Sequence, residues 1–176
     1  VNAAGEFAGS VSGGCIEGAV IEEAQAAIAD GQPRLLEFGV SDEQAWEVGL
    51  ACGGRVQVHV EKLAPDVFDR LMRERAAKRP VARIIRLSDK ASALVAADGA
   101  MGELALSPSQ REALAVRLTS GQSGALDDSG DIFARVYVPA PRLLIVGAVH
   151  IAQALAPMAA MAGFDVAVID PRRAFA

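Results

Sequence analysis

The chain has 176 residues, of which 52% are hydrophobic and 22% charged, so it can bury a core within one or two domains. A formal net charge of -5 and a pI near 5.1 argue against a nucleic-acid partner, because binding to phosphate backbones depends on clustered Lys and Arg. The two cysteines come without a secretory leader, and no apolar run approaches the roughly 20 residues of a membrane-spanning helix. We therefore expect a cytoplasmic protein with no membrane span, whose partners are small molecules or other proteins.

A helix follows the first glycine-rich stretch. Apolar residues recur with helical spacing from Ile16 to residue 28, and Gly31 is placed to end such a helix. Cys15 is therefore expected at a helix N-terminus. The other elements expected up to residue 80 are a β-run at 35–38, a short helix from a Ser41 and Gln44 capping box through Trp46, a strand at 56–60, and a helix opened by Pro65 and closed by Pro80.

The middle of the chain predicts several strands and one helix before a short stiff linker at 139–141. We expect a first domain over residues 1–80 and a small α/β region over residues 81–139, which is either separate or continuous with the first domain. The elements expected in this region are strands at 81–87 and 93–96, a turn at 98–99, a helix that begins with the capping residues 107–110, a loop at 120–131 and a strand at 132–138.

The pattern changes to βαβ over residues 142–176. An apolar strand at 143–146, a helix that ends at Gly163 and a second strand at 165–169 predict a parallel strand pair covered by a helix. The fold class expected for the whole chain is α/β, with an N-terminal α/β domain followed by this Rossmann-like unit. Because the sequence begins without a Met and stops directly after the second strand, we expect a piece of a longer protein.

The turn of the βαβ unit resembles a dinucleotide-binding fingerprint. Gly147, Ala148 and His150 belong to the turn that opens the helix, and Asp170 ends the second strand where a ribose hydroxyl would be bound. Val149 stands where the fingerprint has its middle glycine, and its branched side chain lies where a pyrophosphate would approach. Two interpretations stay open: NAD(P) or another phosphate-bearing ligand binds at this helix N-terminus, or the unit is purely structural.

Both cysteines adjoin paired glycines. Cys15 follows Gly13 and Gly14, and Cys52 precedes Gly53 and Gly54. A thiol near a helix N-terminus can have a lowered pKa, which suits sulfur transfer, redox exchange or ligation of a soft metal; the alternative is that each thiol fills a tight space beside the glycines. We expect no permanent metal site, because two cysteines and two histidines do not have the spacing of a structural zinc site.

The turn from Ser10 to Gly14 suits a second role. Its successive backbone amides open a helix and form a concavity that can bind an anion, to which Ser10 and Ser12 would add hydroxyl donors. The alternative is that the two serines only stabilise the turn and cap the helix. His59 is expected on the exposed face of its strand.

Three stretches are similar to one known family. They are GSVSGGCIEGAV, RLLEFGVSDEQAWEVGLACGGRVQVHVE and PRLLIVGAVHIAQALAPMAAMAGFDVAVIDPRRAFA, and they resemble the XdhC/CoxI family, accessory proteins for the maturation of molybdenum hydroxylases such as xanthine dehydrogenase and aerobic carbon monoxide dehydrogenase. The resemblance covers residues 9–61 and 142–176, in the family's order. It implies an N-terminal XdhC/CoxI domain that lacks its first segment and a Rossmann-like domain that stops after its second strand.

The resemblance implies a cofactor chaperone rather than a turnover enzyme. Such a factor binds molybdenum cofactor (molybdopterin), assists its sulfuration by a cysteine desulfurase and delivers it to the apoenzyme of a molybdenum hydroxylase, and it acts as a homo-oligomer. Because molybdopterin carries a phosphate and a dithiolene-bound molybdenum, an amide-lined turn beside a thiol would offer it one anion site and one soft ligand. The alternative is an NAD(P)-binding oxidoreductase built on the C-terminal unit, although no hydride-handling set of residues is visible.

Overall fold

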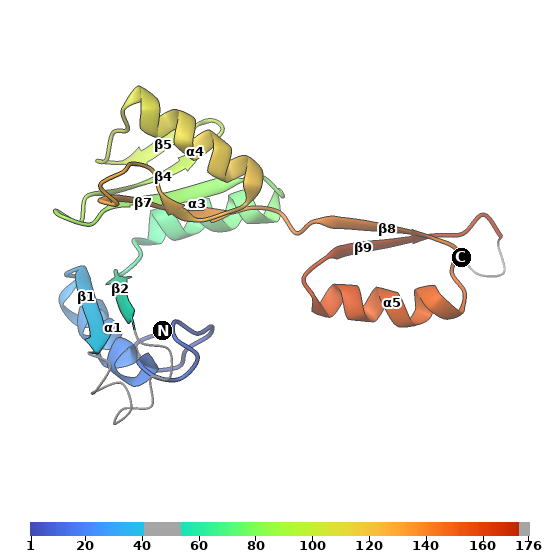
Figure 1. The fold of residues 1–176 in the computed structure, drawn as a ribbon, viewed down its shortest axis with the longest axis horizontal. Helices are drawn as coiled ribbons and strands as arrows, with labels where there is room; N and C mark the ends of the chain where they lie inside the picture. Colours follow the sequence, from blue (N-terminus) through green and yellow to red (C-terminus); the bar gives the residue numbers. More distant parts are fainter. Residues whose placement is uncertain (41–53, 173–176) are drawn as a thin grey trace.

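The structure is a computed structural model that describes residues 1–40 and 54–172. Its elements form three groups that follow one another along the chain (Figure 1). No helix in these two ranges is long and apolar enough to cross a membrane. The elements are α1 (Glu17–Asp30), β1 (Arg34–Val40), β2 (Gly54–Val60), α3 (Pro65–Ala76), β3 (Val81–Arg86), β4 (Ser92–Ala96), β5 (Gly99–Gly102), α4 (Pro108–Ser120), β6 (Gly124–Ala125), β7 (Ile132–Tyr137), β8 (Arg142–Val146), α5 (His150–Met161) and β9 (Asp165–Ile169).

The N-terminal unit is the antiparallel β1–β2 hairpin with α1 packed on one of its faces. The predicted helix is confirmed, and Gly31 ends it in the left-handed conformation, with φ of 73°. Val20, Ala24 and Ala27 of α1 are buried together with Val60 of β2. Because side chains alternate along a strand, the even-numbered side chains of β2 face the helix and the odd-numbered ones face away from it. The expected capping-box helix at 41–46 lies outside the described residues.

The middle unit is an antiparallel five-stranded sheet in the order β5-β4-β3-β7-β6. Helix α4 covers one face, where Leu114 packs with Ile84 and Ala134. The predicted capping box that starts α4 is present, with Ser107 and Gln110 bonded to each other's backbone. The two edge strands, β5 and β6, were not predicted, because they are glycine-containing segments without alternation and pair only once the neighbouring strand is in place.

Helix α3 packs on the other face of this sheet (Figure 1). Val67 and Leu71 of α3 are buried against Val81 and Leu94, and Leu94 is fully buried. The sequence placed α3 in the first domain, with a boundary at residue 80. Because its apolar side chains contact the middle sheet, we propose that the boundary lies instead at residues 61–64, between β2 and α3.

The C-terminal unit is a βαβ element, as predicted. Strands β8 and β9 pair in parallel, and α5 covers the pair. Only Ala152 and Ala159 of α5 are buried, whereas Val146, Ile151 and Met161 are each more than 80% exposed. Two strands and one helix thus leave much of their apolar surface uncovered, which agrees with the start of a larger Rossmann-like sheet.

Candidate functional site

The turn of residues 10–14 closes around a carboxylate that belongs to the chain itself. Glu17 Oε1 accepts hydrogen bonds from Ser10 Oγ (2.7 Å), the Val11 N–H (3.0 Å) and the Ser12 N–H (2.8 Å). Glu17 Oε2 accepts two more, from Ser12 Oγ (2.7 Å) and the Gly14 N–H (2.9 Å). We call residues 10–14 the anion turn, because five donors converge there on one negative charge.

The two serines of the anion turn also accept hydrogen bonds from the backbone. Ser12 Oγ accepts from the Cys15 and Ile16 N–H groups at 3.0 Å each, and Ser10 Oγ accepts from the Gly13 N–H at 2.9 Å. Gly13 and Gly14 have positive φ, 78° and 120°, which L side chains rarely adopt and which explains the paired glycines. These bonds support the turn-stabilising interpretation of Ser10 and Ser12.

Glu17 therefore occupies the concavity that the sequence predicted for an external anion. The hydrogen bonds from Ser12, Ser10 and Val11 lower the pKa of the Glu17 carboxyl far below its usual value of 4.5, so this carboxylate keeps its charge throughout the neutral range. An external phosphate would have to displace it. The role of Ser10, Ser12, Gly13 and Gly14 in cofactor binding stays a prediction.

The first thiol lies beside the anion turn. Cys15 comes directly before Ile16, the N-cap of α1, as predicted, and it is exposed to solvent. Cys52 and Gly53 lie outside the described residues, and Gly54 begins β2, where it pairs with Val40. The sulfur-handling role of the two thiols stays a prediction.

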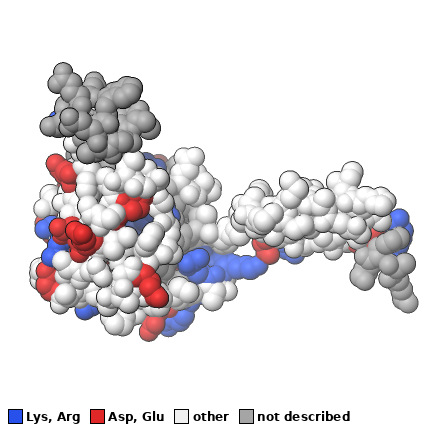
Figure 2. Space-filling view, turned by 90° about the horizontal axis from the view of Figure 1, so that it is seen from below, with Lys and Arg blue, Asp and Glu red and all other residues white. Residues whose placement is uncertain are grey.

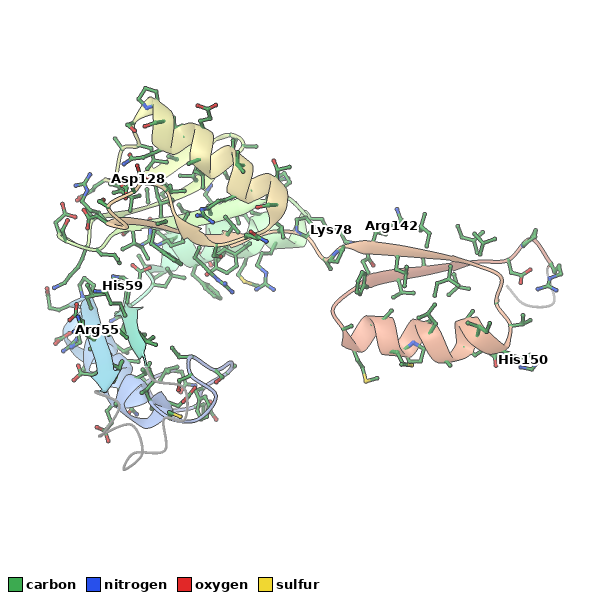
Figure 3. The ribbon with its side chains drawn as sticks, viewed as in Figure 1. Arg55, His59, Lys78, Asp128, Arg142 and His150 are labelled. Carbon is green, nitrogen blue, oxygen red and sulfur yellow. The ribbon has the colours of Figure 1, made fainter. Side chains whose placement is uncertain are left out.

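The Rossmann-like turn also uses its polar groups internally. Gly147 has a φ of 104°, and its N–H donates to the Ile169 carbonyl at 2.8 Å. The next amide, Ala148 N–H, donates to Asp170 Oδ2 at 2.9 Å. Val149 is the extended N-cap of α5, so the helix begins at His150, which is exposed at the end of the unit (Figure 3).

Asp170 is held by its own neighbours. Besides the Ala148 amide, it accepts hydrogen bonds from the Arg172 N–H (2.9 Å), Nε (3.0 Å) and Nη2 (2.8 Å), and its side chain is fully covered. The bonds from Arg172 and Ala148 keep the pKa of the Asp170 carboxyl well below its usual value of 3.8. A ribose hydroxyl would have to replace these bonds, so of the two interpretations left open the geometry favours the structural one.

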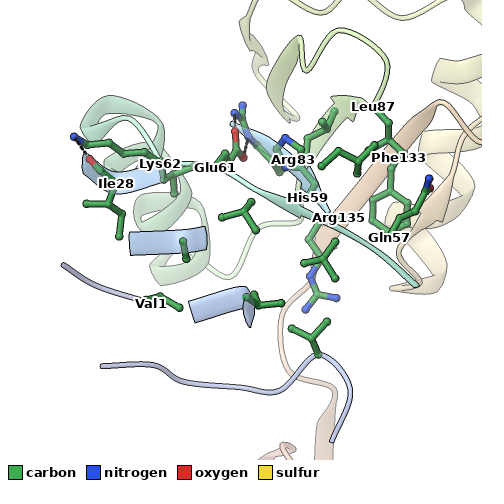
Figure 4. Close-up of a pocket in the computed structure, with 18 of the residues that line it drawn as sticks. Val1, Ile28, Gln57, His59, Glu61, Lys62, Arg83, Leu87, Phe133 and Arg135 are labelled. Carbon is green, nitrogen blue, oxygen red and sulfur yellow. Dashed lines mark hydrogen bonds and ion pairs between the residues drawn. The ribbon is translucent and has the colours of Figure 1, made fainter. Parts of the chain in front are cut away.

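A cavity of about 970 Å³ lies between the N-terminal and middle units, and the sequence did not predict it (Figure 4). We call it the central cleft. Its walls come from α1 and β2 on one side and from β3, β7 and Phe68 of α3 on the other, and Val11 of the anion turn also lines it. On β3 and β7 the lining side chains are the odd-numbered ones, opposite to the face that α4 covers.

One ion pair connects the two sides of the central cleft. Arg83 of β3 donates to Glu61, just after β2, through Nε (2.8 Å) and Nη2 (2.6 Å), and Arg83 Nη2 also donates to Ser92 Oγ at 2.6 Å. The Arg83 side chain is 12% exposed and that of Glu61 20%, so this fork is largely shielded from water. It attaches the end of the hairpin to the middle sheet.

His59 also lines the central cleft, and its predicted place on an exposed strand face is wrong. It is half-buried, and its Nε2 atom is covered from solvent without a hydrogen-bond partner among the described residues. Burial lowers the pKa of His59 from 6.5, which favours the neutral imidazole. The alternation in RVQVHVE predicted His59 on the strand face opposite to that of the valines. That segment by itself does not show that the middle unit lies against this face.

Basic side chains gather where the middle and C-terminal units meet (Figure 2). A smaller cavity of about 390 Å³ there is lined by Arg75, Lys78 and Arg79 among others. Lys78 Nζ contacts Asp165 Oδ2 at 2.5 Å, and Arg79 forms a fork with the buried Glu74. Two of these three cations are thus neutralised by carboxylates. Over residues 1–40 and 54–172, no cluster of His, Cys, Asp and Glu could hold a metal ion.

Both ends of the chain are similar to known protein families. Residues 1–39 match the XdhC and CoxI family, and residues 143–176 match the XdhC Rossmann domain. A Bacillus subtilis protein named as a probable xanthine dehydrogenase subunit is 25% identical over 97% of this chain and 53% of its own length. A molybdenum cofactor insertion chaperone of Escherichia coli, PaoD, is 28% identical over 94% of this chain and 44% of its own length.

A solved structure supports the fold. The crystal structure of a xanthine dehydrogenase from Bacillus halodurans superposes with a TM-score of 0.71 and 25% identity, over 94% of this chain and 50% of that one. The chain thus spans about half the length of the relatives it matches. The two ends of the chain are thus similar to the XdhC and CoxI family and to the XdhC Rossmann domain, in the expected order, and a βαβ unit lies where the Rossmann domain is matched.

Proposed function

We propose that this chain is part of an accessory factor for the maturation of molybdenum hydroxylases. It binds molybdenum cofactor, assists its sulfuration and delivers it to the apoenzyme of a xanthine dehydrogenase or a carbon monoxide dehydrogenase. The observation that carries this proposal is the pair of family matches, supported by a relative named as a molybdenum cofactor insertion chaperone that aligns with 94% of the chain. A cysteine desulfurase is the proposed sulfur donor, and a homo-oligomer is the proposed working state.

The arrangement suits a carrier better than a turnover enzyme. Several of the polar groups predicted as ligands in the two glycine turns already donate to carboxylates of the chain: Ser10, Ser12 and Gly14 to Glu17, and the Ala148 N–H to Asp170. The central cleft, in contrast, is large enough for a small molecule and lies between two units joined by a short connector. A carrier has to bind its cargo and release it again, and an interface between units can open for that purpose.

The proposal is tested with residues 1–176 and molybdenum cofactor released from a donor enzyme under anaerobic conditions. We expect the protein to retain about one molybdenum per chain or oligomer site through gel filtration, and to activate an apo-hydroxylase faster than free cofactor does. Absence of both retention and activation would overturn the proposal.

The two thiols are tested in the same assay with Cys15→Ser and Cys52→Ser. If sulfur handling passes through them, each variant should still retain cofactor but deliver it in a form that activates the apoenzyme poorly. Unchanged activation by both variants would show that the cysteines only fill space, while the maturation role would stand. NAD serves as the comparison ligand, because Asp170 and the Ala148 amide are already bonded to each other.

A further inference from the structure

The central cleft has apolar walls, and two of its aromatic side chains stay partly exposed among residues 1–40 and 54–172. Phe68 is 49% exposed and Phe133 37% exposed, and both line the cavity together with Ile85 and Tyr137. The cavity volume, about 970 Å³, lies at the upper end of the roughly 300–1,000 Å³ typical of small-molecule sites. Exposed aromatic side chains within one concave surface indicate a ligand with a flat apolar face.

Two arginines lie directly opposite each other on the sheet side of the central cleft. Arg83 of β3 is paired in register with Arg135 of β7. Only the first is neutralised, by the fork to Glu61. Arg135 lies over the Tyr137 ring, with its guanidinium carbon 5.6 Å from the ring centroid, and donates one long hydrogen bond to Ser123 Oγ at 3.4 Å. It forms no ion pair within the part of the chain that the structure describes. Like charges at opposite positions of neighbouring strands repel, so an anion at Arg135 would relieve the repulsion.

On the hairpin side of the central cleft, a buried polar atom also needs a hydrogen-bond partner. His59 Nε2 is withdrawn from solvent without a partner among residues 1–40 and 54–172, and His59 lines the same cavity as Arg135 (Figure 4). Leaving a buried polar atom unbonded costs free energy, so such atoms in native proteins usually have a partner. A ligand with polar ring atoms would supply one.

We propose that the central cleft binds a planar heteroaromatic ring that carries an anionic group, with the ring against Phe133 and Ile85, His59 Nε2 hydrogen-bonded to a ring atom, and Arg135 paired with the anion. This inference rests on the proposed function, from which the ligand is identified as the pterin phosphate part of molybdenum cofactor. A purine nucleotide shares this chemistry and is the competing source. The two glycine turns are then not the main cofactor contacts, because their amides are used within the chain, among them Gly14 by Glu17 and Ala148 by Asp170.

The test is a fluorescence titration of residues 1–176 with pterin-6-carboxylate, a flat pterin with one anionic group. Arg135→Gln and His59→Phe are the site variants. Arg111→Gln is the matched control, because Arg111 is exposed on α4, which covers the opposite face of the sheet. We expect Arg135→Gln to weaken binding about tenfold or more, the usual effect of losing a charge-assisted hydrogen bond, and His59→Phe to weaken it less. Arg111→Gln should bind like the wild type.

Several results would overturn the inference. They are absence of pterin binding, equal affinity in Arg135→Gln and Arg111→Gln, and competition by inorganic phosphate alone as strong as that by the pterin. Tighter binding of GMP than of the pterin would replace the assigned ligand by a purine nucleotide. Retention of whole molybdenum cofactor by Arg135→Gln at wild-type affinity would remove the cleft as its site but leave the maturation role standing. Pterin binding at Arg135 without any cofactor transfer would remove the maturation role instead.

Discussion

The ion pair between Glu61 and Arg83 should stabilise the attachment of the N-terminal unit to the middle sheet. Replacing Glu61 by Gln keeps the size of the side chain but removes the charge that Arg83 Nε and Nη2 contact at 2.8 and 2.6 Å. It also leaves two unneutralised arginines side by side, because Arg83 is in register with Arg135. Both effects disfavour the native arrangement of the central cleft.

The magnitude follows from the exposure of the two side chains, 12% for Arg83 and 20% for Glu61. Exposed ion pairs contribute about 0–1 kcal/mol, whereas breaking a buried pair costs about 3–5 kcal/mol. For a pair that is mostly but not fully shielded, we expect Glu61→Gln to lower the free energy of unfolding by about 2 kcal/mol. Arg83→Gln should cost a similar amount, and the double variant should cost less than the sum.

The assay is urea unfolding followed by far-UV circular dichroism for the wild type, the two single variants and the double variant. Asp89→Asn is the control, because its pair with Arg86 joins neighbouring residues on the surface and Asn can still accept the Ala91 N–H, so its effect should be clearly smaller than that of Glu61→Gln. A coupling energy below about 0.5 kcal/mol would refute the reasoning, since that is the range of a fully screened pair. It would mean that the fork does not hold the hairpin to the sheet.

Three further predictions concern single residues outside this pair. Since the pKa of His59 is lowered in the folded state, the protein should lose stability as pH falls below about 6.5, the unfolded value. In His59→Gln the midpoint of thermal unfolding should depend less on pH in this range, whereas an unchanged slope would assign the loss to other groups. The lowered pKa of Glu17 gives stability that is present above pH 4.5 and lost in acid, so the stability of Glu17→Gln should depend less on pH in the acid range. The variant should also exchange the Ser12 and Gly14 amide hydrogens faster, and unchanged exchange would contradict the observed hydrogen bonds. Val149→Gly should change the free energy of unfolding by less than about 0.5 kcal/mol, because glycine adds entropy to the unfolded chain but is the better N-cap. Calorimetry should detect no NAD binding to this variant, and micromolar affinity for NAD would restore the nucleotide interpretation.

The sequence predicted the elements whose signals are local. The apolar spacing after Ile16 with Gly31 at its end predicted α1, the capping box at Ser107 predicted the start of α4, and the βαβ pattern predicted the parallel pair of β8 and β9. Each of these signals depends on residues a few positions apart, because helix caps and side-chain periods are set within one or two turns. The resemblance of the two ends of the chain to a known family was also carried by contiguous motifs, and the family matches confirmed it.

The sequence also identified the two glycine turns as places where backbone amides converge, but it did not show what fills them. In both turns the occupant is a carboxylate of the same chain, Glu17 in one and Asp170 in the other. The first lies three residues beyond Gly14, in the first turn of α1. The second lies 22 residues from Ala148, so only the pairing of β8 with β9 brings it to the turn.

The central cleft was decided entirely by the tertiary structure. The sequence predicted His59 on the exposed face of its strand and a strand at 132–138, but it could not show that His59 and Arg135 line one cavity. That outcome depends on which strands neighbour each other in the middle sheet and on how the hairpin is attached to it through Glu61 and Arg83. Contacts between residues so far apart in the sequence leave no local pattern, because each strand satisfies its own period whichever surface it faces.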